Sequence, residues 1–460
     1  MSHQKASVAE FYNGKTILIT GGTGFIGKCL IEKLLRSCSG IKRIFILLRG
    51  KRGKSVHERM ESFKKEVIFQ QLPGTALDKL VGIESDLSSG CISVPREGTL
   101  HLQSSTKTLL DFASSLKNLE IFVHVSTAYS KCDNSKIIEE KIYPPYMDWR
   151  YAIRMAEQID GEILDSAHAR WSTDVANTYV FTKNIAEYMV YEHKDKLPVL
   201  IYRPSVVVPA EREPIPGFID NFNGPTSIFL SASIGINRVL YSPKNGEINM
   251  IPVDMVIRGL IIAAVKNANE KNSASVYNAA SIKVKKTIDL VETGKKVVEE
   301  VPANVMLWRP DGKVTSCIYD FYSIVIFTQI LPAILVDGVL KLYKKQPMLL
   351  KYQRIIMNAQ VSLQYFISNY WTIENEKFMN LNNFLAKSEL KEFEIKELIP
   401  GTAEYLKLSM MGSRRHLMHW PDKTLENAKK LYRRMVLLDQ VVKYAVLAIF
   451  IYFIYNKFFC

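Results

Sequence analysis

The sequence predicts an α/β fold whose first three hundred residues contain a doubly wound parallel sheet. Three observations support this prediction. Short apolar runs rich in β-branched residues alternate with longer segments of helical periodicity, and glycines follow the first apolar run. From about residue 285 the pattern changes to helices without strands. Strands that alternate with helices pair in parallel, because each helix carries the chain back across one face of the sheet.

Each predicted element is a short segment of the N-terminal part. Residues 25–37 form the clearest helix, since their five large aliphatic side chains fall on one side at helical spacing. The first strand, KTILIT, ends directly at a group of glycines. The predicted strands are residues 15–20, 43–48, 81–85, 120–126 and 198–203, and the further helices lie near 55–70, at 104–117 and at 177–193.

The turn after the first strand has the spacing of a nucleotide-binding loop. The segment Thr20-Gly21-Gly22-Thr23-Gly24-Phe25-Ile26-Gly27 places a GxxGxxG pattern between a strand and a helix. Glycine permits the tight turn and lets the backbone approach a pyrophosphate at the helix N-terminus. The alternative is a glycine turn that binds nothing. We expect a dinucleotide here.

The residues after the second and third strands bear on which dinucleotide is bound. Leu48 is followed by Arg49 and three further cations within six residues, where an enzyme that prefers NAD usually carries an acid. Cations suit the 2′-phosphate of NADP, although a solvated basic loop is the alternative. Asp86 closes the third strand, where its carboxylate could hydrogen-bond the adenine or cap a helix.

A tyrosine and a lysine stand one helical turn apart at Tyr179 and Lys183. A phenol is a poor acid near neutrality, and a neighbouring ammonium is expected to lower its pKa. Such a tyrosine can donate a proton to a carbonyl that receives a hydride. Ser126 and Thr127 end the preceding strand, where a hydroxyl could bond the same oxygen. A surface Tyr–Lys pair is the alternative.

Composition narrows the class of protein further. The chain has 460 residues and a net charge of +14, which favours nucleic acid, an anionic membrane or acidic small molecules. The basic residues are spread along the chain and form no nucleic-acid module, so we expect no nucleic-acid partner. Six cysteines form no CxxC pair, which suits free thiols in a reducing compartment. The polar N-terminus predicts no signal peptide.

These motifs together resemble the extended short-chain dehydrogenase/reductases, which have a Rossmann fold, and more narrowly the animal type of fatty acyl-CoA reductase. The resemblance covers most of the chain, including a helical C-terminal domain. The segments that carry it are GKTILITGGTGFIGKCLIEKLLRSC (14–38), FVHVSTAYSKC (122–132), IEEKIYPP (138–145), NTYVFTKNIAE (177–187), YRPSVV (202–207), GFIDNFNGP (217–225), IPVDMVI (251–257) and LLKYQRIIMNAQVSLQYFISNYWTIENE (349–376).

The resemblance implies a reaction and a set of site residues. NADPH would reduce a long-chain acyl-CoA to an aldehyde and then to a primary alcohol, with release of CoA. Thr127, in preference to Ser126, would act with Tyr179 and Lys183 as the catalytic trio. The expected cofactor-binding residues are Gly21, Thr23, Gly24, Phe25, Ile26, Gly27, Arg49, Asp86 and Lys183.

The sequence departs from the family between Asp86 and the strand at 120. The family carries another strand and helix here, but the intervening residues leave room for only one crossover. CISV (91–94) or LHLQ (100–103) could partly substitute for the missing strand, which would lie at the cofactor's switch point. Three explanations stay open: a shortened form of an active enzyme, an inactive paralogue, or a working variant with a remodelled sheet.

The C-terminus predicts a membrane anchor. The run from Tyr444 to Tyr455 is apolar but shorter than a spanning helix needs, and four cations at residues 429–434 precede it as on a cytosolic flank. An in-plane amphipathic helix is the alternative. A second apolar stretch, 321–336, contains Pro332, and we expect it to shape the acyl site or touch the membrane.

Residues 1–300 are therefore expected to form the NADP-binding domain, 301–434 a helical domain and 435–460 the anchor. The catalytic domain would face the cytosol at the endoplasmic reticulum, a peroxisome or a lipid droplet. Two other functions compete with the reductase: a non-catalytic membrane-bound homologue, and an extended reductase acting on a sterol or ketone. The helical C-terminal resemblance argues against the last of these.

Overall fold

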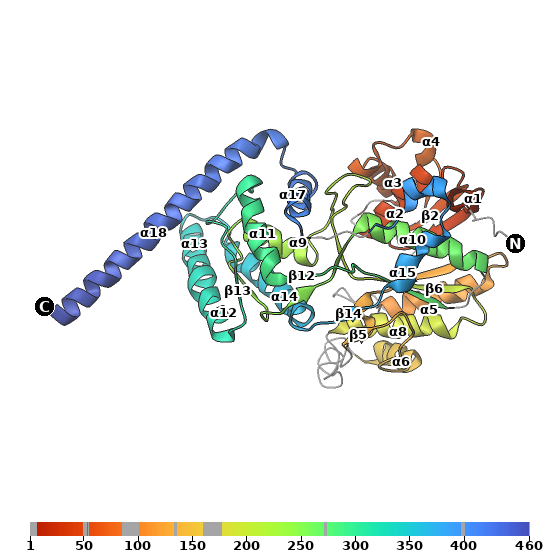
Figure 1. The fold of residues 1–460 in the computed structure, drawn as a ribbon, viewed down its shortest axis with the longest axis horizontal. Helices are drawn as coiled ribbons and strands as arrows, with labels where there is room; N and C mark the ends of the chain where they lie inside the picture. The colour runs from red at the N-terminus through yellow and green to blue at the C-terminus, as the bar shows by residue number, and fades with distance from the viewer. Residues whose placement is uncertain are drawn as a thin grey trace.

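The computed structural model describes residues 7–48, 53, 55–84, 101–132, 136–159, 177–270, 274–396 and 401–459. Arg49, Asp86 and the CISV segment lie outside these ranges. Figure 1 shows two lobes and a long projecting helix. One lobe contains the N-terminal strands and their helices, and the other contains most of the helices that follow residue 285 together with α9.

The N-terminal lobe has the predicted alternation of strands and helices. All pairings in its main sheets are parallel, as expected for a doubly wound fold. The last strand, β11, was not predicted. The strands are β1 (Thr16–Ile19), β2 (Arg43–Leu48), β3 (Leu80–Glu84), β4 (Phe122–Val125), β6 (Val199–Pro204) and β11 (Ser275–Ala279); the helices are α2 (Phe25–Ser37), α3 (Val56–Lys64), α5 (His101–Ser115), α8 (Thr178–Glu192) and α10 (Val253–Glu270).

The parallel sheet is divided into two halves. One half has the order β1-β2-β3 and the other β11-β6-β4, so no described strand pairs with the second edge of β1 or of β4. Lys15 and Glu120, which directly precede these two strands, form an ion pair across the division. Leu18 on β1 remains 39% exposed, whereas every residue of β6 is buried. This arrangement is the one expected if a strand between β1 and β4 is missing.

Two segments, CISV (91–94) and LHLQ (100–103), are the predicted substitutes for that strand. Residues 101–103 of the LHLQ segment begin α5, so these residues do not supply a strand. The described part of α5 begins at His101, three residues earlier than predicted. CISV (91–94) lies outside the described residues.

Helix α10 connects the two half-sheets. Its buried side chains belong to one hydrophobic cluster with residues of β1 and β2 on one side and β6 and β11 on the other. The Tyr202 hydroxyl donates to the Val256 carbonyl at 2.8 Å, which fixes β6 to this helix. Packing against α10 therefore holds the halves together where backbone hydrogen bonding between described strands does not.

The second lobe is built around short strands covered by helices. The prediction of helices without strands after residue 285 is wrong in part, because β12 (Lys285–Lys286), β13 (Lys313–Thr315) and β14 (Thr372–Ile373) occur there. Strands of two or three residues are too short to show a period. The other strands of this lobe are β7 (Val206–Val208), β8 (Val239–Tyr241), β9 (Glu247–Ile248) and β10 (Met250–Pro252), and its main helices are α9 (Pro225–Ser233), α11 (Thr287–Glu300), α14 (Leu349–Ser368) and α17 (Ala403–Gly412).

After α14 the chain returns to the N-terminal lobe. Helices α15 (Glu376–Met379) and α16 (Leu390–Phe393) place Phe378 and Phe393 in the same hydrophobic cluster as β1 and α10. The two lobes therefore interleave along the sequence. The boundaries at residues 300 and 434 stay predictions.

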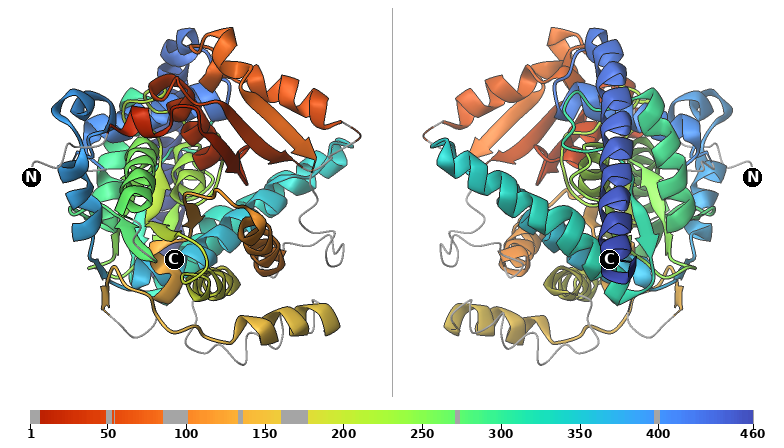
Figure 2. Two further views of the ribbon diagram at one scale, coloured as in Figure 1. Left: turned by 90° about the vertical axis from the view of Figure 1, so that its right-hand side faces the viewer. Right: turned by 90° about the vertical axis from the view of Figure 1, so that its left-hand side faces the viewer.

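Two helices of the second lobe are long and apolar enough to cross a membrane by length and composition alone. One runs from Ile318 to Leu342 and the other is within α18 (Leu425–Phe459). Figure 2 shows that both lie at the same end of the molecule, with α18 reaching the C-terminus. The described residues of the anchor predicted at 435–460 thus form the C-terminal part of a single long helix, which is exposed from residue 440 to residue 457.

Candidate active site

The glycine turn has the geometry of a phosphate-binding loop. Gly21 has a φ of +65°, a conformation that side chains other than glycine rarely adopt. A Cβ on Gly27 would lie 2.5 Å from the Gly21 carbonyl oxygen and 2.7 Å from the Gly22 Cα. Glycine at position 27 therefore lets α2 begin directly against the turn. A Cβ on Gly24 would meet the same oxygen at 3.3 Å, which is a milder contact.

The first turn of α2 offers backbone N–H groups to an anion. Gly24 precedes the helix in extended conformation, and no side chain caps the N–H groups of Phe25, Ile26 and Gly27. The Phe25 ring packs near Phe218, with ring centroids 6.1 Å apart, and this contact holds the start of the helix. A helix N-terminus of this kind binds phosphate through the free N–H groups and the helix dipole. The turn therefore fits a dinucleotide, with Thr23 on its exposed side.

The three predicted catalytic side chains come together at the end of β4. Thr127 follows this strand, and its hydroxyl accepts a hydrogen bond from the Tyr129 N–H at 3.3 Å. Thr127 also lies close enough to the phenol of Tyr179 to lower the pKa of that phenol. Lys183, one turn further along α8, donates to the Val125 carbonyl at 2.9 Å. Asn177 caps this helix through Val180 at 2.9 Å and so fixes where Tyr179 enters it.

Burial controls the protonation of these groups. Tyr179 is 48% exposed, and the partial desolvation of its phenol raises the pKa above its usual value, while Thr127 acts in the opposite direction. The expectation that Lys183 lowers the pKa of Tyr179 is wrong for this arrangement, because the ammonium is directed to the Val125 carbonyl instead. Burial lowers the pKa of Lys183 to about 8, and Glu187 partly opposes this shift.

A buried ion pair fixes α8 against the neighbouring strand and was missed in the sequence. Arg203 Nε donates to Glu187 at 2.9 Å, and both side chains are almost completely buried. The Ser130 hydroxyl donates to the same carboxylate at 3.2 Å. Glu187 thereby joins the helix of Tyr179 to the loop of Thr127. Its place four residues after Lys183, and an arginine inside the apolar run LIYRP, were the available signals.

Two buried polar atoms at this edge have no partner among the described residues: His124 Nε2 and Ser126 Oγ. Burial, together with the Lys183 charge, lowers the pKa of His124 to about 3, so this imidazole is neutral. A histidine inside the apolar strand FVHV was the signal for it. Unpaired buried polar atoms beside the glycine turn suit a site that receives a polar ligand.

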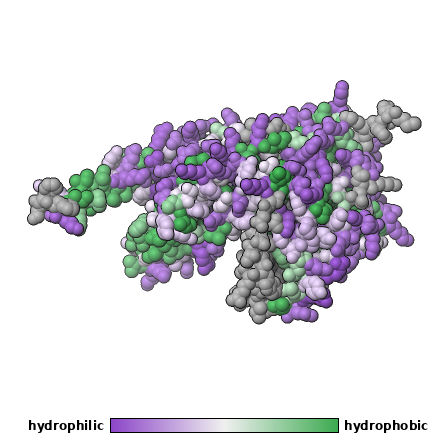
Figure 3. Space-filling view, turned by 60° about the horizontal axis from the view of Figure 1, so that its bottom comes forward, coloured by the Kyte–Doolittle hydropathy of each residue, from purple (hydrophilic) through white to green (hydrophobic). Residues whose placement is uncertain are grey.

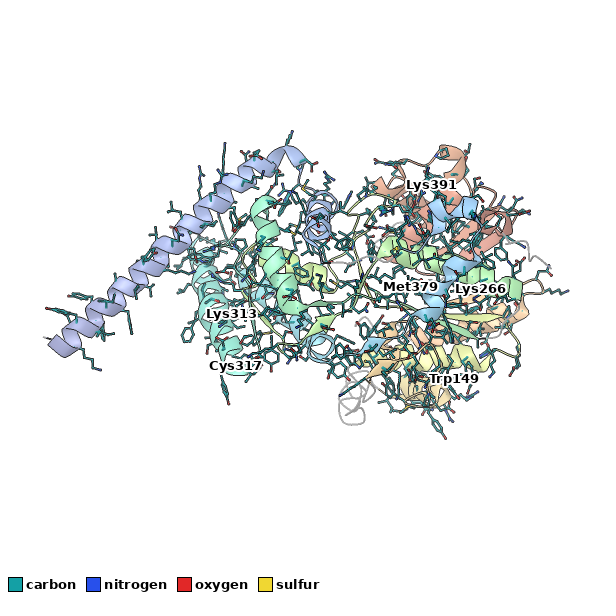
Figure 4. All side chains as sticks on the ribbon, in the orientation of Figure 1. Trp149, Lys266, Lys313, Cys317, Met379 and Lys391 are labelled. Carbon is teal, nitrogen blue, oxygen red and sulfur yellow. The ribbon has the colours of Figure 1, made fainter. Side chains whose placement is uncertain are left out.

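An apolar cavity of about 140 Å³ lies in the second lobe. It is enclosed by α9, α11, α14, α17 and the β8–β13 pair, and Phe229, Val291 and Leu363 line it. Figure 4 shows Lys313, another lining residue, in this lobe, apart from Trp149 and Lys266 of the N-terminal lobe.

Helix α14 connects this cavity with the catalytic loop. Leu363 and Ile367 face the cavity, while Phe366 packs on Tyr129 with ring centroids 5.1 Å apart. Tyr129 in turn bonds Thr127 through its N–H. The cavity and the loop of Thr127 are therefore linked through α14 and the contact between Phe366 and Tyr129.

The structure describes seven of the nine predicted cofactor-binding residues, all except Arg49 and Asp86, and it brings together all three predicted catalytic ones. Among the residues it describes, no group of three or more His, Cys, Asp or Glu side chains could hold a metal ion. Cys29, Cys38 and Cys132 are buried free thiols, and Cys317 is an exposed one. The site is therefore one of hydroxyls and a lysine beside a nucleotide loop.

Comparison with family models gives two matches, both described as "Male sterility protein". An NAD-binding model matches residues 19–105 and 102–260, and a second model matches residues 328–420. The first match is in two pieces, which meet at residues 102–105. This position lies within the segment where the sequence is expected to lack a strand.

Curated relatives and solved structures agree with these matches. The protein named fatty acyl-CoA reductase 1 from Xenopus laevis is 32% identical over 92% of this chain and 88% of its own length. The Homo sapiens protein of the same name is 31% identical with the same coverage. Among structures, the terminal R domain of the myxalamid biosynthetic pathway has a TM-score of 0.57 at 14% identity, covering 88% of this chain and 91% of that one. A thiolation-reductase di-domain from an archaeal non-ribosomal peptide synthetase has a TM-score of 0.53 at 15% identity, covering 90% and 79%. These two solved structures share the fold of this chain.

Proposed function

We propose that this chain, which belongs to the fatty acyl-CoA reductase family, reduces long-chain fatty acyl-CoA to the primary alcohol with NADPH. The observation that supports this most directly is the proximity of Thr127 to the phenol of Tyr179, in a chain that also carries a turn with the geometry of a nucleotide-binding loop. Such a pair can bind a carbonyl oxygen and deliver a proton to it.

The overall reaction needs two reductions. One acyl-CoA, two NADPH and two protons give one alcohol, free CoA and two NADP⁺. When bound, the cofactor supplies hydride to the carbonyl carbon. In the first reduction the C–S bond breaks after hydride addition and leaves an aldehyde, and in the second the aldehyde oxygen gains a proton and becomes the hydroxyl.

The protein's own side chains hold the carbonyl and supply the proton. Tyr179 is protonated at neutral pH, as a phenol with a raised pKa must be, and it can donate that proton to the oxygen as negative charge develops there. Thr127 hydrogen-bonds the same oxygen and positions the phenol. Lys183 would bind the ribose of the cofactor, and its ammonium already lies at the end of β4.

The choice of NADPH over NADH rests on the basic residues that begin at Arg49. They directly follow β2, the strand beside the one that leads into the glycine turn. A cation at this position can pair with a 2′-phosphate, which only NADP(H) carries. Asp86, after β3, would hydrogen-bond the adenine.

The apolar cavity supports a long acyl chain as the substrate. Its walls offer almost no hydrogen-bonding groups, so an alkyl chain is the ligand that they suit. Its connection through α14 to Thr127 would allow the thioester to lie at the hydroxyl pair while the chain extends into the second lobe.

The exposed end of α18 supports attachment to a membrane. Tyr444 to Tyr455 are apolar and exposed, and Lys429, Lys430, Arg433 and Arg434 precede them on the same helix. This order is the one expected if the cations and the catalytic lobe face the cytosol. The endoplasmic reticulum, a peroxisome or a lipid droplet could provide this membrane.

The divided sheet bears on a second candidate function, a homologue that binds acyl-CoA without reducing it. Among the described residues, β1 and β4 do not pair with a common strand, so no shared backbone ladder joins the glycine turn to Thr127. Activity of the intact chain distinguishes the two.

The experiment is an alcohol-forming assay with full-length protein in detergent. We expect NADPH to support conversion of long-chain acyl-CoA to alcohol, detected by gas chromatography, and NADH to support much less. Tyr179→Phe should abolish the product, while Tyr188→Phe on the same helix should not. Alcohol formation that survives Tyr179→Phe would refute the proton donor. Absence of NADPH oxidation with every chain length would favour the second candidate.

A further inference from the structure

The long apolar helix of the second lobe is attached to the protein along its length. Helix α12 (Ile318–Val325), a π-helical turn and α13 (Leu331–Leu342) form one continuous rod. Its buried residues recur every four positions and face β8 and α14: Phe321, Val325, Gln329, Ala333 and Asp337. A helix fastened in this way does not leave the protein body to cross a bilayer.

Asp337 forms the strongest of these attachments. Its carboxylate accepts hydrogen bonds from the backbone N–H groups of Met348, Leu349 and Leu350, each at 3.0 Å. These N–H groups belong to the start of α14 and would otherwise lack an acceptor. One acidic residue thus ties the rod to the next helix.

The opposite side of the rod is a continuous exposed apolar surface, called here the outer face. Phe327 is 69% exposed and Leu335 is 70% exposed. Figure 3 shows apolar residues gathered at the end of the molecule from which the C-terminal helix projects. Soluble monomers rarely expose continuous apolar surface of this kind without a partner. The outer face consists of Tyr319, Tyr322, Ile326, Phe327, Leu331, Ile334, Leu335, Val339 and Leu342.

The ends of the outer face carry the residue types found at a lipid–water boundary. Tyr319 is exposed at one end and Tyr343 at the other. Tyrosine prefers this boundary because its ring is apolar and its hydroxyl polar. The sequence between Asp337 and Glu374 contains no acid and five cations: Lys341, Lys344, Lys345, Lys351 and Arg354. This charge complements anionic lipid headgroups.

The outer face and the candidate anchor lie at the same end of the molecule. Asp439 fixes α18 to the body, since it accepts from Trp308 Nε1 at 2.7 Å and is 1% exposed in its side chain. Beyond Lys443 the helix projects from the body with its apolar side chains exposed. The twelve residues from Tyr444 to Tyr455 extend about 18 Å, against about 30 Å for a hydrocarbon core. Figure 1 shows α13 near the middle of α18 and the C-terminal end of α18 projecting away from it.

We propose that the outer face lies in the interfacial layer of an anionic membrane, parallel to its plane, beside the α18 anchor. The bilayer covers the apolar side chains, and the cations at the end of the rod pair with lipid phosphates and carboxylates. A second copy of the chain suits this surface less, because it would bring two sets of cations together. The proposal rests on the membrane attachment proposed for α18 and is independent of catalysis.

The test measures the depth of a spin label at chosen sites of the full-length protein. Cys91, Cys317 and Cys460 are first replaced by Ser, so that each added cysteine is the accessible one. Labels are placed by Leu335→Cys in the outer face and by Ile449→Cys in the anchor. The control label is placed by Val305→Cys, because Val305 is 55% exposed and lies outside both segments. Vesicles contain phosphatidylcholine and phosphatidylserine at a ratio of about seven to three, an anionic composition of the kind basic segments bind.

We expect vesicles to make the label at 335 more accessible to oxygen and less accessible to a water-soluble nickel chelate. The label at 449 should change likewise, and that at 305 should not. If 449 enters the bilayer and 335 stays accessible to nickel, the inference is wrong and the anchor stands. If neither enters, both are wrong. Protection of 335 without vesicles that increases with protein concentration would mean that a second copy covers the face, which also overturns the inference.

The charge contribution is tested separately. Lys341→Gln, Lys344→Gln and Lys345→Gln together should weaken binding to the anionic vesicles by roughly fivefold per residue, or about a hundredfold in all. Binding to vesicles of phosphatidylcholine alone should not change. An equal effect on both vesicle types, or none on either, would contradict the assignment of these cations to anionic lipid.

Discussion

Gly294 on α11 offers a way to shorten the apolar cavity without disturbing the catalytic loop. It lines the cavity, and a Cβ at this position would have Phe229 Cε1 as its nearest neighbour at 3.8 Å, an ordinary contact. Gly294→Leu therefore adds four carbon atoms that grow into the cavity. The helix itself should gain stability, because glycine is an unfavourable residue in a helix interior by about 0.8–1.0 kcal/mol.

The effect on catalysis should depend on the length of the acyl chain. If four methylene groups of the longest chain no longer fit in the cavity, the binding free energy falls by roughly 3 kcal/mol, at about 0.8 kcal/mol for each buried methylene. This corresponds to more than about a hundredfold in kcat/KM for the longest substrates. Chains too short to reach Gly294 should react at the normal rate.

The assay compares kcat/KM along a series of saturated acyl-CoAs that increase by two carbons. Gly338→Leu is the matched control, since Gly338 is also a helix glycine but has no atom within 4 Å of its Cβ position and does not line the cavity. We expect the control to follow the parent protein at every length. A uniform loss across the series in Gly294→Leu, or a loss shared with the control, would refute the assignment of the cavity to the acyl chain.

Three further predictions concern the nucleotide turn and the buried charges. Gly27→Ala should abolish NADPH binding, measured by cofactor fluorescence, because its Cβ would lie 2.5 Å from the turn, whereas Gly24→Ala at 3.3 Å should reduce binding much less; equal effects would contradict this geometry. His124 is held neutral with a pKa of about 3, so unfolding takes up a proton below its ordinary value of 6.5 and stability falls as pH falls through that value. Between pH 7 and pH 5 this group should cost about 2 kcal/mol of unfolding free energy, and His124→Met should remove that part of the slope in urea titrations; an unchanged slope would show that His124 is not buried neutral. Glu187→Gln should destabilise the fold by about 3–5 kcal/mol, because Arg203 would stay buried without its partner; a change below 1 kcal/mol in thermal or denaturant unfolding would contradict the burial of this pair.

The sequence predicts the N-terminal elements well because their signals are local. A buried parallel strand is an unbroken apolar run, and the turn after β1 needs glycine at positions 21 and 27 for reasons confined to a few residues. The convergence of Thr127 with Tyr179 could be predicted from motif order, since both follow from the ends of neighbouring elements. A deficit of residues before α5 is the signal on which the expectation of a missing strand rests.

The remaining features depend on contacts between residues distant in the sequence. Phe378 and Phe393 return to the core of the N-terminal lobe, and no local pattern indicates this. The direction of the Lys183 ammonium depends on the position of the Val125 carbonyl, which spacing along one helix does not give. Short strands such as β13 form only because β8 is present to pair with them. The cavity needs four helices from separate parts of the chain.

Helix α10 gives the divided sheet a mechanical character of its own. In a continuous sheet, two neighbouring strands cannot slide past each other without breaking a ladder of backbone hydrogen bonds. Here the described parts of β1 and β4 share no such ladder, and the two halves meet on the side chains of one helix. Side-chain packing tolerates small sliding movements far better than a hydrogen-bonded ladder does. The loop that would bind the cofactor and the strand end that carries Thr127 therefore belong to different half-sheets, and these half-sheets can shift slightly relative to each other. A ligand that contacts both half-sheets would restrict this movement, which backbone hydrogen bonds between the described strands do not restrict.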